Sequence, residues 1–514
     1  LYELENVECV HGRYPSTHAL VDLLSAIVPH VAPASQADTL VAYMRDASLP
    51  WWHSGRNSTT ASSTTASTGH GSGNSMSTSM YVAYVLDHVL LPASNRTYAR
   101  PAERWAISAS CLEFAEKCLA TLPVAPVDTA HPGFDVLRRL LSGTPLLREL
   151  FFFVHPDPSC AGYEVINMNR AQTSDFSRAV RAALRILLRM LEVQNDVLHN
   201  VPSINDHAAV KDRALFLALD VHLLQAHQVV VQIALYILCV DTEIAWLAVR
   251  LLGALARTST FQATDAFGPL RARTSRNRLA GLLDMAGETA RVTSGVLAWL
   301  EADTGMDADS DNLNYDADVN GNYHASGTTA HMDMSSSLSD ADGAASLNDT
   351  ATGILPAKIQ KELLDLFLEQ LVPDAPAPNV AHLLLGFDMD ASDPDRLVHE
   401  SRDAILLTLV QRVTPPCTWP PTLAERCYAV LQRACVHPYT SASMLRFLRT
   451  HDFVATQLGS LPLVPLSVTS SSSATGPSFG TLMYASGETV NTRTEWALAL
   501  LRTHAHILSL VALE

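Results

Sequence analysis

The sequence is poor in charged residues, and the charge it carries is not basic. Charged residues make up 17% of the 514 positions and hydrophobic residues 48%, whereas a typical soluble domain is about 25% charged. Lysine and arginine total 35 against 52 acidic residues, and no window gathers them into a basic patch. Nucleic-acid-binding proteins need such patches to displace counterions from phosphates. The composition therefore argues against DNA or RNA as a direct partner and leaves ample apolar surface for a core.

The motifs of common catalytic and metal sites are also missing. The sequence has no CxxC pair, no HExxH and no Walker loop. Its eight cysteines lie mostly inside apolar helical patterns, which is typical of reduced core cysteines. We therefore predict that the protein is not an enzyme, and we expect no catalytic residues, no cofactor and no metal-binding residues.

Two short segments come closest to a ligand site. Asp316, Asp318, Asn320 and Gly321 match the start of a calcium-binding loop, but a glycine stands at the twelfth position, where a bidentate glutamate is needed. The glycine-rich run at Gly69–Gly73 has no preceding strand, unlike a phosphate-binding loop. Both lie in low-complexity sequence, where alternating aspartates or glycines arise by chance, so solvated chain is the preferred interpretation for each.

Three segments of biased composition interrupt the chain. They are the Ser/Thr/Gly-rich residues 54–80, the acidic residues 302–353 and the serine-rich residues 467–480. Glu301–Gly353 alone contains eleven carboxylates and neither lysine nor arginine, so subtracting eleven from the net charge of -17 leaves -6 for the rest. Such segments bury too little apolar surface to offset the entropy of ordering. We expect disordered insertions in surface loops.

Elsewhere, apolar residues recur at intervals of three and four, which places them on one face of an α-helix. The clearest stripes run through Leu20–Val28, Val82–Leu90, Trp105–Leu122 and Phe176–Leu191. The first includes Leu23 and Leu24, and Ser16 is placed to cap that helix. No fixed repeat period emerges. The pattern predicts an all-α fold, an irregular stacked-helix solenoid of the HEAT or armadillo type, running continuously over residues 1–514 between the insertions.

Three features leave alternatives open. Residues 214–240 are strongly apolar but include Asp220 and several histidines and glutamines, so they favour a buried helix over a membrane span. Arg178, Arg181, Arg185 and Arg189 form a stripe that could face an acidic partner, although the solvated side of an amphipathic helix is preferred. The tryptophans on apolar stripes, such as those at 105 and 496, are more often core residues than peptide anchors.

A series of local patterns, in a fixed order, resembles the large inner-ring scaffold nucleoporins, the bigger of two related families of giant helical solenoids. They are Tyr14-Pro15-Ser16-Thr17, Tyr98-Ala99-Arg100, Glu103-Arg104-Trp105, Pro132-Gly133-Phe134, Gly143-Thr144-Pro145-Leu146-Leu147, Leu385-Gly386-Phe387, Leu423–Tyr428, Met444–Thr450 and Asp452-Phe453. Each pattern is weak alone, and the order carries the resemblance. The chain begins at Leu1 without an initiator methionine, so we expect a fragment of a longer protein. The resemblance implies that it comes from the later part of the amino-terminal half of such a protein.

The resemblance implies a structural scaffold of the nuclear pore complex at the nuclear envelope, within a large symmetric assembly that supports nucleocytoplasmic transport. It further implies partners among the other inner-ring nucleoporins, above all disordered linker nucleoporins that dock by short motifs. No motif-binding residue can be assigned from the sequence. The alternative is a soluble nuclear transport receptor of the HEAT-repeat type, which would also be large, helical and acidic.

Overall fold

The structure is a computed structural model, and it describes most of the chain outside the predicted insertions. The described residues are 2–28, 80–122, 131–143, 145–155, 174–200, 217–267, 274–303, 343–375, 378–387, 404–415, 417, 419–459, 465–471, 479–484 and 489–513. Within them the protein is predominantly α-helical, with two small antiparallel sheets. The predicted all-α, stacked-helix fold is thereby confirmed.

The chain divides into two compact units, each with its own buried aromatic residues. Unit 1 is Leu1–Val292 with Pro378–Val380, and unit 2 is Thr293–Ala377 with Ala381–Glu514. Phe114 is fully buried in unit 1, as is Phe367 in unit 2. The two units give two separate cores within what the sequence pattern predicted as one continuous solenoid.

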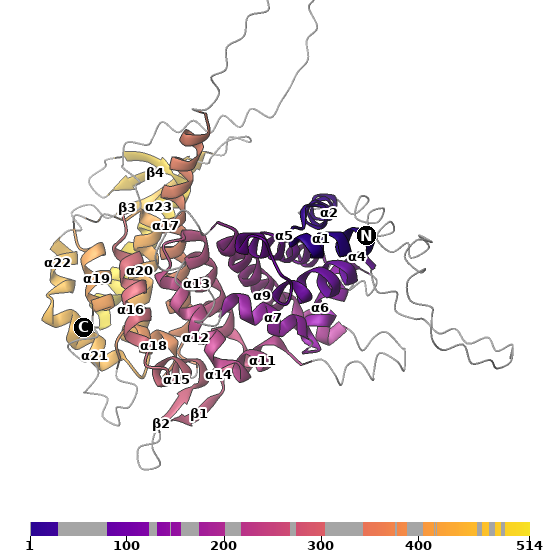
Figure 1. The fold of residues 1–514 in the computed structure, drawn as a ribbon. Helices are drawn as coiled ribbons and strands as arrows, with labels where there is room; N and C mark the ends of the chain where they lie inside the picture. The colour runs from indigo at the N-terminus through magenta and orange to yellow at the C-terminus, as the bar shows by residue number, and fades with distance from the viewer. Residues whose placement is uncertain are drawn as a thin grey trace, which may run out of the picture. The chain divides into compact units, whose positions relative to one another are not determined.

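Unit 1 consists of short and long helices with one hairpin (Figure 1). Its elements are α1 (Tyr2–His11), α2 (Pro15–Ile27), α4 (Met80–Ala83), the π-helix η2 (Tyr84–Leu90), the 3-10 helix η3 (Leu91–Ser94), α5 (Pro101–Ala120), α6 (Pro132–Leu141), α7 (Pro145–Val154), α9 (Ser174–Asn200), α11 (Leu219–Gln225), α12 (His227–Leu235), the 3-10 helix η5 (Tyr236–Leu238), α13 (Thr242–Arg257), α14 (Ser259–Gln262), β1 (Thr264–Phe267), β2 (Thr274–Asn277), α15 (Arg278–Met285) and the start of α16 (Thr289–Glu301).

The predicted stripes of unit 1 are confirmed for three of the four helices. Val85 and Leu86 in η2, Leu112 in α5 and Leu184 in α9 are all buried. The stripe of α2 is rotated from the prediction, because Val21 and Leu24 are buried whereas Leu23 is 57% exposed.

The start of α2 also differs from the prediction, because a residue from the preceding helix caps it. The helix begins at Pro15, and Ser16 does not cap it with its side chain. Instead the Glu8 carboxylate accepts hydrogen bonds from the backbone nitrogens of Ser16 and Thr17 and from the Thr17 hydroxyl. A buried carboxylate at a helix start satisfies unpaired backbone donors and interacts favourably with the helix dipole.

The apolar stretch 214–240 does not form one helix. Its described part contains α11 and α12, which meet at a bend of 94°. Tyr236, in η5, is buried and donates a 2.7 Å hydrogen bond to the Val154 carbonyl oxygen of α7. The segment thus lies in the helical core, as predicted, but as a broken helix.

Unit 2 has longer helices and a three-stranded sheet. Its elements are the rest of α16, α17 (Gly343–Gln370), α18 (Val380–Leu384), α19 (Ala404–Val413), α20 (Pro421–Val436), α21 (Ser441–Thr450), α22 (Phe453–Gly459), β3 (Pro465–Ser471), β4 (Phe479–Tyr484), β5 (Thr489–Arg493) and α23 (Thr494–Leu513). The sheet order is β3-β4-β5, both pairs are antiparallel, and α23 lies against all three strands.

These elements correct the predicted insertions in two places. Residues 467–480 are not a loop throughout, because β3 pairs with β4 from Pro465–Tyr484 to Ser471–Phe479 and so satisfies the backbone of both ends. Helix α17 starts at Gly343, inside the predicted acidic insertion 302–353. Residues 304–342, which contain the calcium-like motif, lie outside the described residues, as do residues 54–79 with their glycine-rich run.

One helix among the described residues is long and apolar enough to cross a membrane, namely Glu495–Leu513 of α23. Its polar residues are held by protein instead. The Ser509 hydroxyl accepts a hydrogen bond from Gln432 of α20, and His506 contacts both Gln432 and Glu425 of the same helix. Burial lowers the pKa of His504 and of His506. These contacts place α23 in the helical stack of unit 2.

Candidate functional site

Four helices of unit 1 pack successively, α2 on α5, α5 on α9 and α9 on α13. Side-chain contacts give their directions. His18 of α2 meets Ser110 of α5, and Lys117, seven residues further along α5, donates to the carbonyl oxygen of Ser25, seven residues further along α2. Equal steps in the same direction mean that α2 and α5 run parallel.

The same register argument extends across the next two helices. Glu113 and Glu116 of α5 bind arginines 178 and 185 of α9, in the same order along both helices. Glu243 of α13 binds Arg185, and Arg250 binds Glu192. All four helices are therefore parallel, as corresponding helices are in a solenoid.

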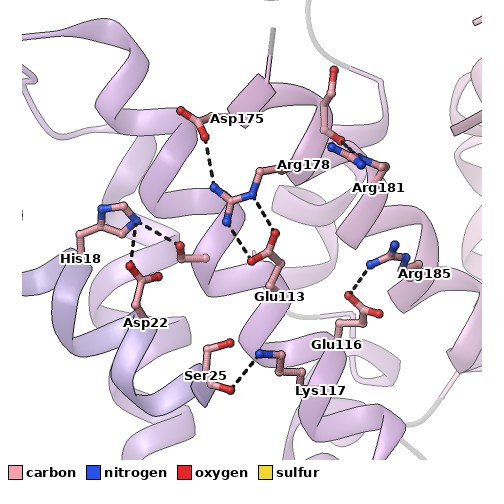
Figure 2. Close-up of polar contacts among 12 residues, drawn as sticks. His18, Asp22, Ser25, Glu113, Glu116, Lys117, Asp175, Arg178, Arg181 and Arg185 are labelled. Atoms are coloured by element: carbon pink, nitrogen blue, oxygen red, sulfur yellow. Dashed lines mark hydrogen bonds and ion pairs between the residues drawn. The ribbon is translucent and has the colours of Figure 1, made fainter. Parts of the chain in front are cut away.

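These contacts form a row that we call the polar ladder, and Figure 2 shows its part from α2 to Arg185 of α9. Its members are His18, Asp22 and Ser25 of α2; Ser110, Glu113, Glu116 and Lys117 of α5; Asp175, Arg178, Arg181, Arg185, Arg189 and Glu192 of α9; Glu243 and Arg250 of α13; and Asp241, the N-cap residue of α13. Most of its partners are far apart in sequence but lie on adjacent helices.

The arginines of the ladder bridge helices. Arg178 binds Glu113 with two hydrogen bonds of 3.0 and 2.9 Å, and it also binds Asp175 on its own helix at 3.2 Å. Arg181 binds Glu243 at 2.9 Å. Arg185 lies between Glu116 and Glu243 and so joins α5, α9 and α13. Two-pronged arginine–carboxylate pairs fix orientation as well as distance.

The electrostatic state of the ladder follows from these contacts. Burial alone would raise the pKa of Glu243, but the hydrogen bonds and charges of Arg181 and Arg185 outweigh it and hold that pKa below its usual value. The hydrogen bond to Glu113 raises the pKa of Arg178. Glu243 is therefore ionised at neutral pH, and its charge is matched by two arginines.

This arrangement corrects the preferred interpretation of the arginine stripe as a solvated helix face, because the carboxylates it meets belong to the same chain. Three of its residues, Arg178, Arg181 and Arg185, form ion pairs with neighbouring helices, so the stripe is not simply the solvated side of α9. Trp105, on the apolar stripe of α5, is half-buried and packs edge-on against Phe153 and Phe176. The sequence pattern could locate these arginines but not their acceptors, because the acceptors are on other helices.

Chemistry other than ion pairing has little support among the described residues. Within them, no group of three or more histidine, cysteine, aspartate or glutamate side chains could hold a metal ion. The cysteines of α5 and α20 are buried, and burial raises the pKa of each of these thiols. Such thiols stay protonated and are poor nucleophiles. The ladder can hold helices in register and offer charged groups to a partner.

Comparison with known proteins assigns the whole chain to one family. The family described as nuclear pore complex scaffold, nucleoporins 186/192/205, matches residues 1–514. No individually curated protein matches the sequence.

Proposed function

The chain belongs to the nucleoporin 186/192/205 family of nuclear pore complex scaffold proteins, and from this premise we propose that it forms part of the inner ring and docks short motifs of linker nucleoporins. The family is structural, its members lie at the nuclear envelope, and their partners include other nucleoporins. Inner-ring placement, linker docking and support of transport are the proposed parts. The alternative function, a soluble transport receptor, is not supported by the family that the chain matches.

The observation that carries the docking proposal is the apolar surface left on α23. Leu498 is 42% exposed and Leu508 is 56% exposed. Leu498, Leu501, Ala505, Leu508 and Ala512 follow one another at steps of three and four, so they share one face of the helix. An apolar stripe of this kind fits the apolar side of an amphipathic segment. We therefore expect a linker motif to bind there mainly through apolar contacts.

A pull-down with purified linker nucleoporins tests this proposal. Leu508→Asp should remove most of the retained linker, because it places a charge in an apolar contact. The matched control is Val240→Asp, which changes another exposed apolar residue, in unit 1. Retention should persist between about 0.1 and about 0.5 M salt, since apolar contacts are not screened. It should also survive deletion of residues 304–342, which leaves α16 and α17 intact.

Three results would contradict the proposal. Linkers that bind neither the wild-type chain nor its deletion variant would exclude linker docking. Binding that disappears at the higher salt concentration would indicate an electrostatic contact. Equal losses in Leu508→Asp and Val240→Asp would indicate a nonspecific effect of surface charge.

A further inference from the structure

One end of the polar ladder differs from the rest, because its donors outnumber its acceptors. Glu192 accepts from Arg189 at 3.3 Å and from Arg250 at 3.4 Å. Elsewhere Arg178 and Arg185 each meet two carboxylates. At this end two arginines share one carboxylate, so the local charge is positive by one.

Two donors at this end also lack hydrogen-bond acceptors. Within the described part of the chain, Arg189 Nε and Trp246 Nε1 are both buried from solvent and have no hydrogen-bond partner. A buried donor without an acceptor costs on the order of 1–3 kcal/mol, so such atoms are usually paired. Both donors are therefore available to an acceptor that a ligand supplies.

The register of the ladder places these two donors opposite each other. Arg185 pairs with Glu243, and Glu192 pairs with Arg250. Arg189 lies midway between the two pairing positions on α9, and Trp246 lies midway between those on α13. Because the two helices are parallel, Arg189 and Trp246 lie at the same level of the ladder, and both are linked to Arg250, one through Glu192 and the other through the ring contact.

The site is accessible through flexible side chains. The side chains of Arg189, Glu192 and Arg250 are 30%, 41% and 33% exposed. The guanidinium of Arg250 lies over the Trp246 ring, 4.9 Å from its centre. Exposed side chains of this kind change rotamer within nanoseconds, so a ligand can reach the indole nitrogen when Arg250 moves aside.

We propose that Arg189, Trp246 and Arg250 form a binding site for a carboxylate, supplied by an aspartate or glutamate side chain of a docking partner. A carboxylate has two oxygens, which matches the two unpaired donors, and its charge balances the unmatched arginine. Hydrogen bonds between charged groups are also the strong ones. The inference rests on the proposed function only in taking the carboxylate from a partner nucleoporin. The site uses residues of α9 and α13 and none of α23.

Acetate titration followed by NMR tests the site without knowledge of the partner. The indole N–H signal of Trp246 is identified by its loss in Trp246→Phe. At constant ionic strength, acetate should move this signal saturably, whereas acetamide, which has the same shape but no charge, should not. Arg189→Gln should weaken acetate binding about tenfold, because it removes one charged hydrogen bond. The control Arg178→Gln, which alters a ladder arginine with its own two carboxylate partners, should leave the affinity unchanged.

A second variant keeps the test decisive if Arg189→Gln fails to fold. Glu192→Gln removes the carboxylate that competes for both arginines, so acetate should bind several-fold more tightly. The proposal is overturned if acetate causes no shift, if acetamide acts equally, or if neither variant changes the affinity. Linker pull-downs separate this result from the proposed function. Saturable acetate binding without linker capture would exclude linker docking but support the carboxylate site. Linker capture without acetate binding would support linker docking but exclude the carboxylate site.

Discussion

The two units differ in the polar groups that accompany the apolar packing of their helices, although unit 2 also has a half-exposed ion pair, Arg426–Asp365, between α20 and α17. In unit 1, half-exposed arginines and carboxylates join α5, α9 and α13 above an apolar core. In unit 2, His382 and His437 are buried side by side, with ring centres 4.8 Å apart, and Tyr439 packs edge-on against His382 at 5.2 Å. One unit therefore places charge at the rim of its helical interface, and the other places neutral, titratable rings inside it.

Because of this difference, the stability of the two units should depend differently on salt concentration and on pH. Half-exposed ion pairs contribute little energy and are screened by salt. A buried neutral histidine resists protonation, so it ties stability to pH. Burial, with a smaller contribution from His437, lowers the pKa of His382 to about 3. We therefore expect unit 1 to respond weakly to salt and unit 2 to respond strongly to mild acid.

The largest effects should come from the feature the units share, which is the apolar core. Phe114→Ala in unit 1 and Phe367→Ala in unit 2 each remove a fully buried ring and should cost about 3–5 kcal/mol. Hydrogen exchange resolved by peptide should show the loss mainly in the unit that carries the change. A loss spread equally over both units would show that they unfold as one, which would break the comparison.

A backbone contact in unit 1 should give the next largest effect. A Cβ atom on Gly133, at the start of α6, would lie 2.2 Å from the Cys118 carbonyl oxygen of α5. Gly133→Ala should therefore force α6 away from α5 and cost about 2–3 kcal/mol. The control is Gly459→Ala, since no atom lies within 4 Å of that Cβ position. Thermal melting compares the two, and equal melting temperatures would exclude close packing at Gly133.

Mild acid should separate the two units. The folded pKa of His382 lies below its unfolded value of 6.5, so its stabilising contribution is complete above pH 6.5 and is lost as the pH falls. Each unit of pH costs up to about 1.4 kcal/mol, so unit 2 should lose about 2 kcal/mol between pH 6.5 and 5. Glu243 in unit 1 has a lowered pKa, so its contribution to the stability of unit 1 is lost only below about pH 4.3.

Denaturant unfolding at several pH values, with unit-resolved hydrogen exchange, measures this dependence. His382→Phe should reduce the slope, with a remainder from His437, His504 and His506, whose pKa values burial also lowers. Phe387→Leu is the matched control, because it alters a buried neighbour of His382 without removing a titrating group. A slope that is unchanged in His382→Phe, or that lies in unit 1, would contradict the assignment.

Much of the fold could be predicted because the family patterns mark structural requirements that are local in sequence. Gly386, in the Leu-Gly-Phe pattern, has φ 88°, a region that favours glycine, and the chain turns there so that Phe387 is fully buried. Gly133, in the Pro-Gly-Phe pattern, lets α6 approach α5. The stripes in α5 and α9 were predictable for a similar reason, since helical periodicity depends only on neighbours in sequence.

The rest depended on contacts between distant residues. Leu23 is exposed and Val21 buried because the face of α2 that meets α5 is set by packing, which its own spacing leaves open. The serine-rich segment forms β3 because β4 is available to pair with it. The acceptors of the arginine stripe lie about 60 residues away in sequence, as Arg178 and Glu113 illustrate. Composition alone cannot identify such pairs.

The smallest predicted effect is the most direct test of how unit 1 is built. Arg185 joins three helices, but its side chain is 35% exposed, and exposed ion pairs contribute about 0.2–1 kcal/mol. Arg185→Gln should therefore cost about 1 kcal/mol and should reduce the salt dependence of unit 1 alone. A double-mutant cycle with Glu243→Gln isolates the pair, and we expect a coupling of about 0.5–1 kcal/mol at low salt that falls as salt screens it.

Because Glu243 also binds Arg181, the same cycle with Arg181→Gln shows whether the two arginines act independently or as one network. A coupling near zero in both cycles would mean that apolar packing alone sets the register of α9 and α13, and that the polar ladder follows from that register without stabilising it.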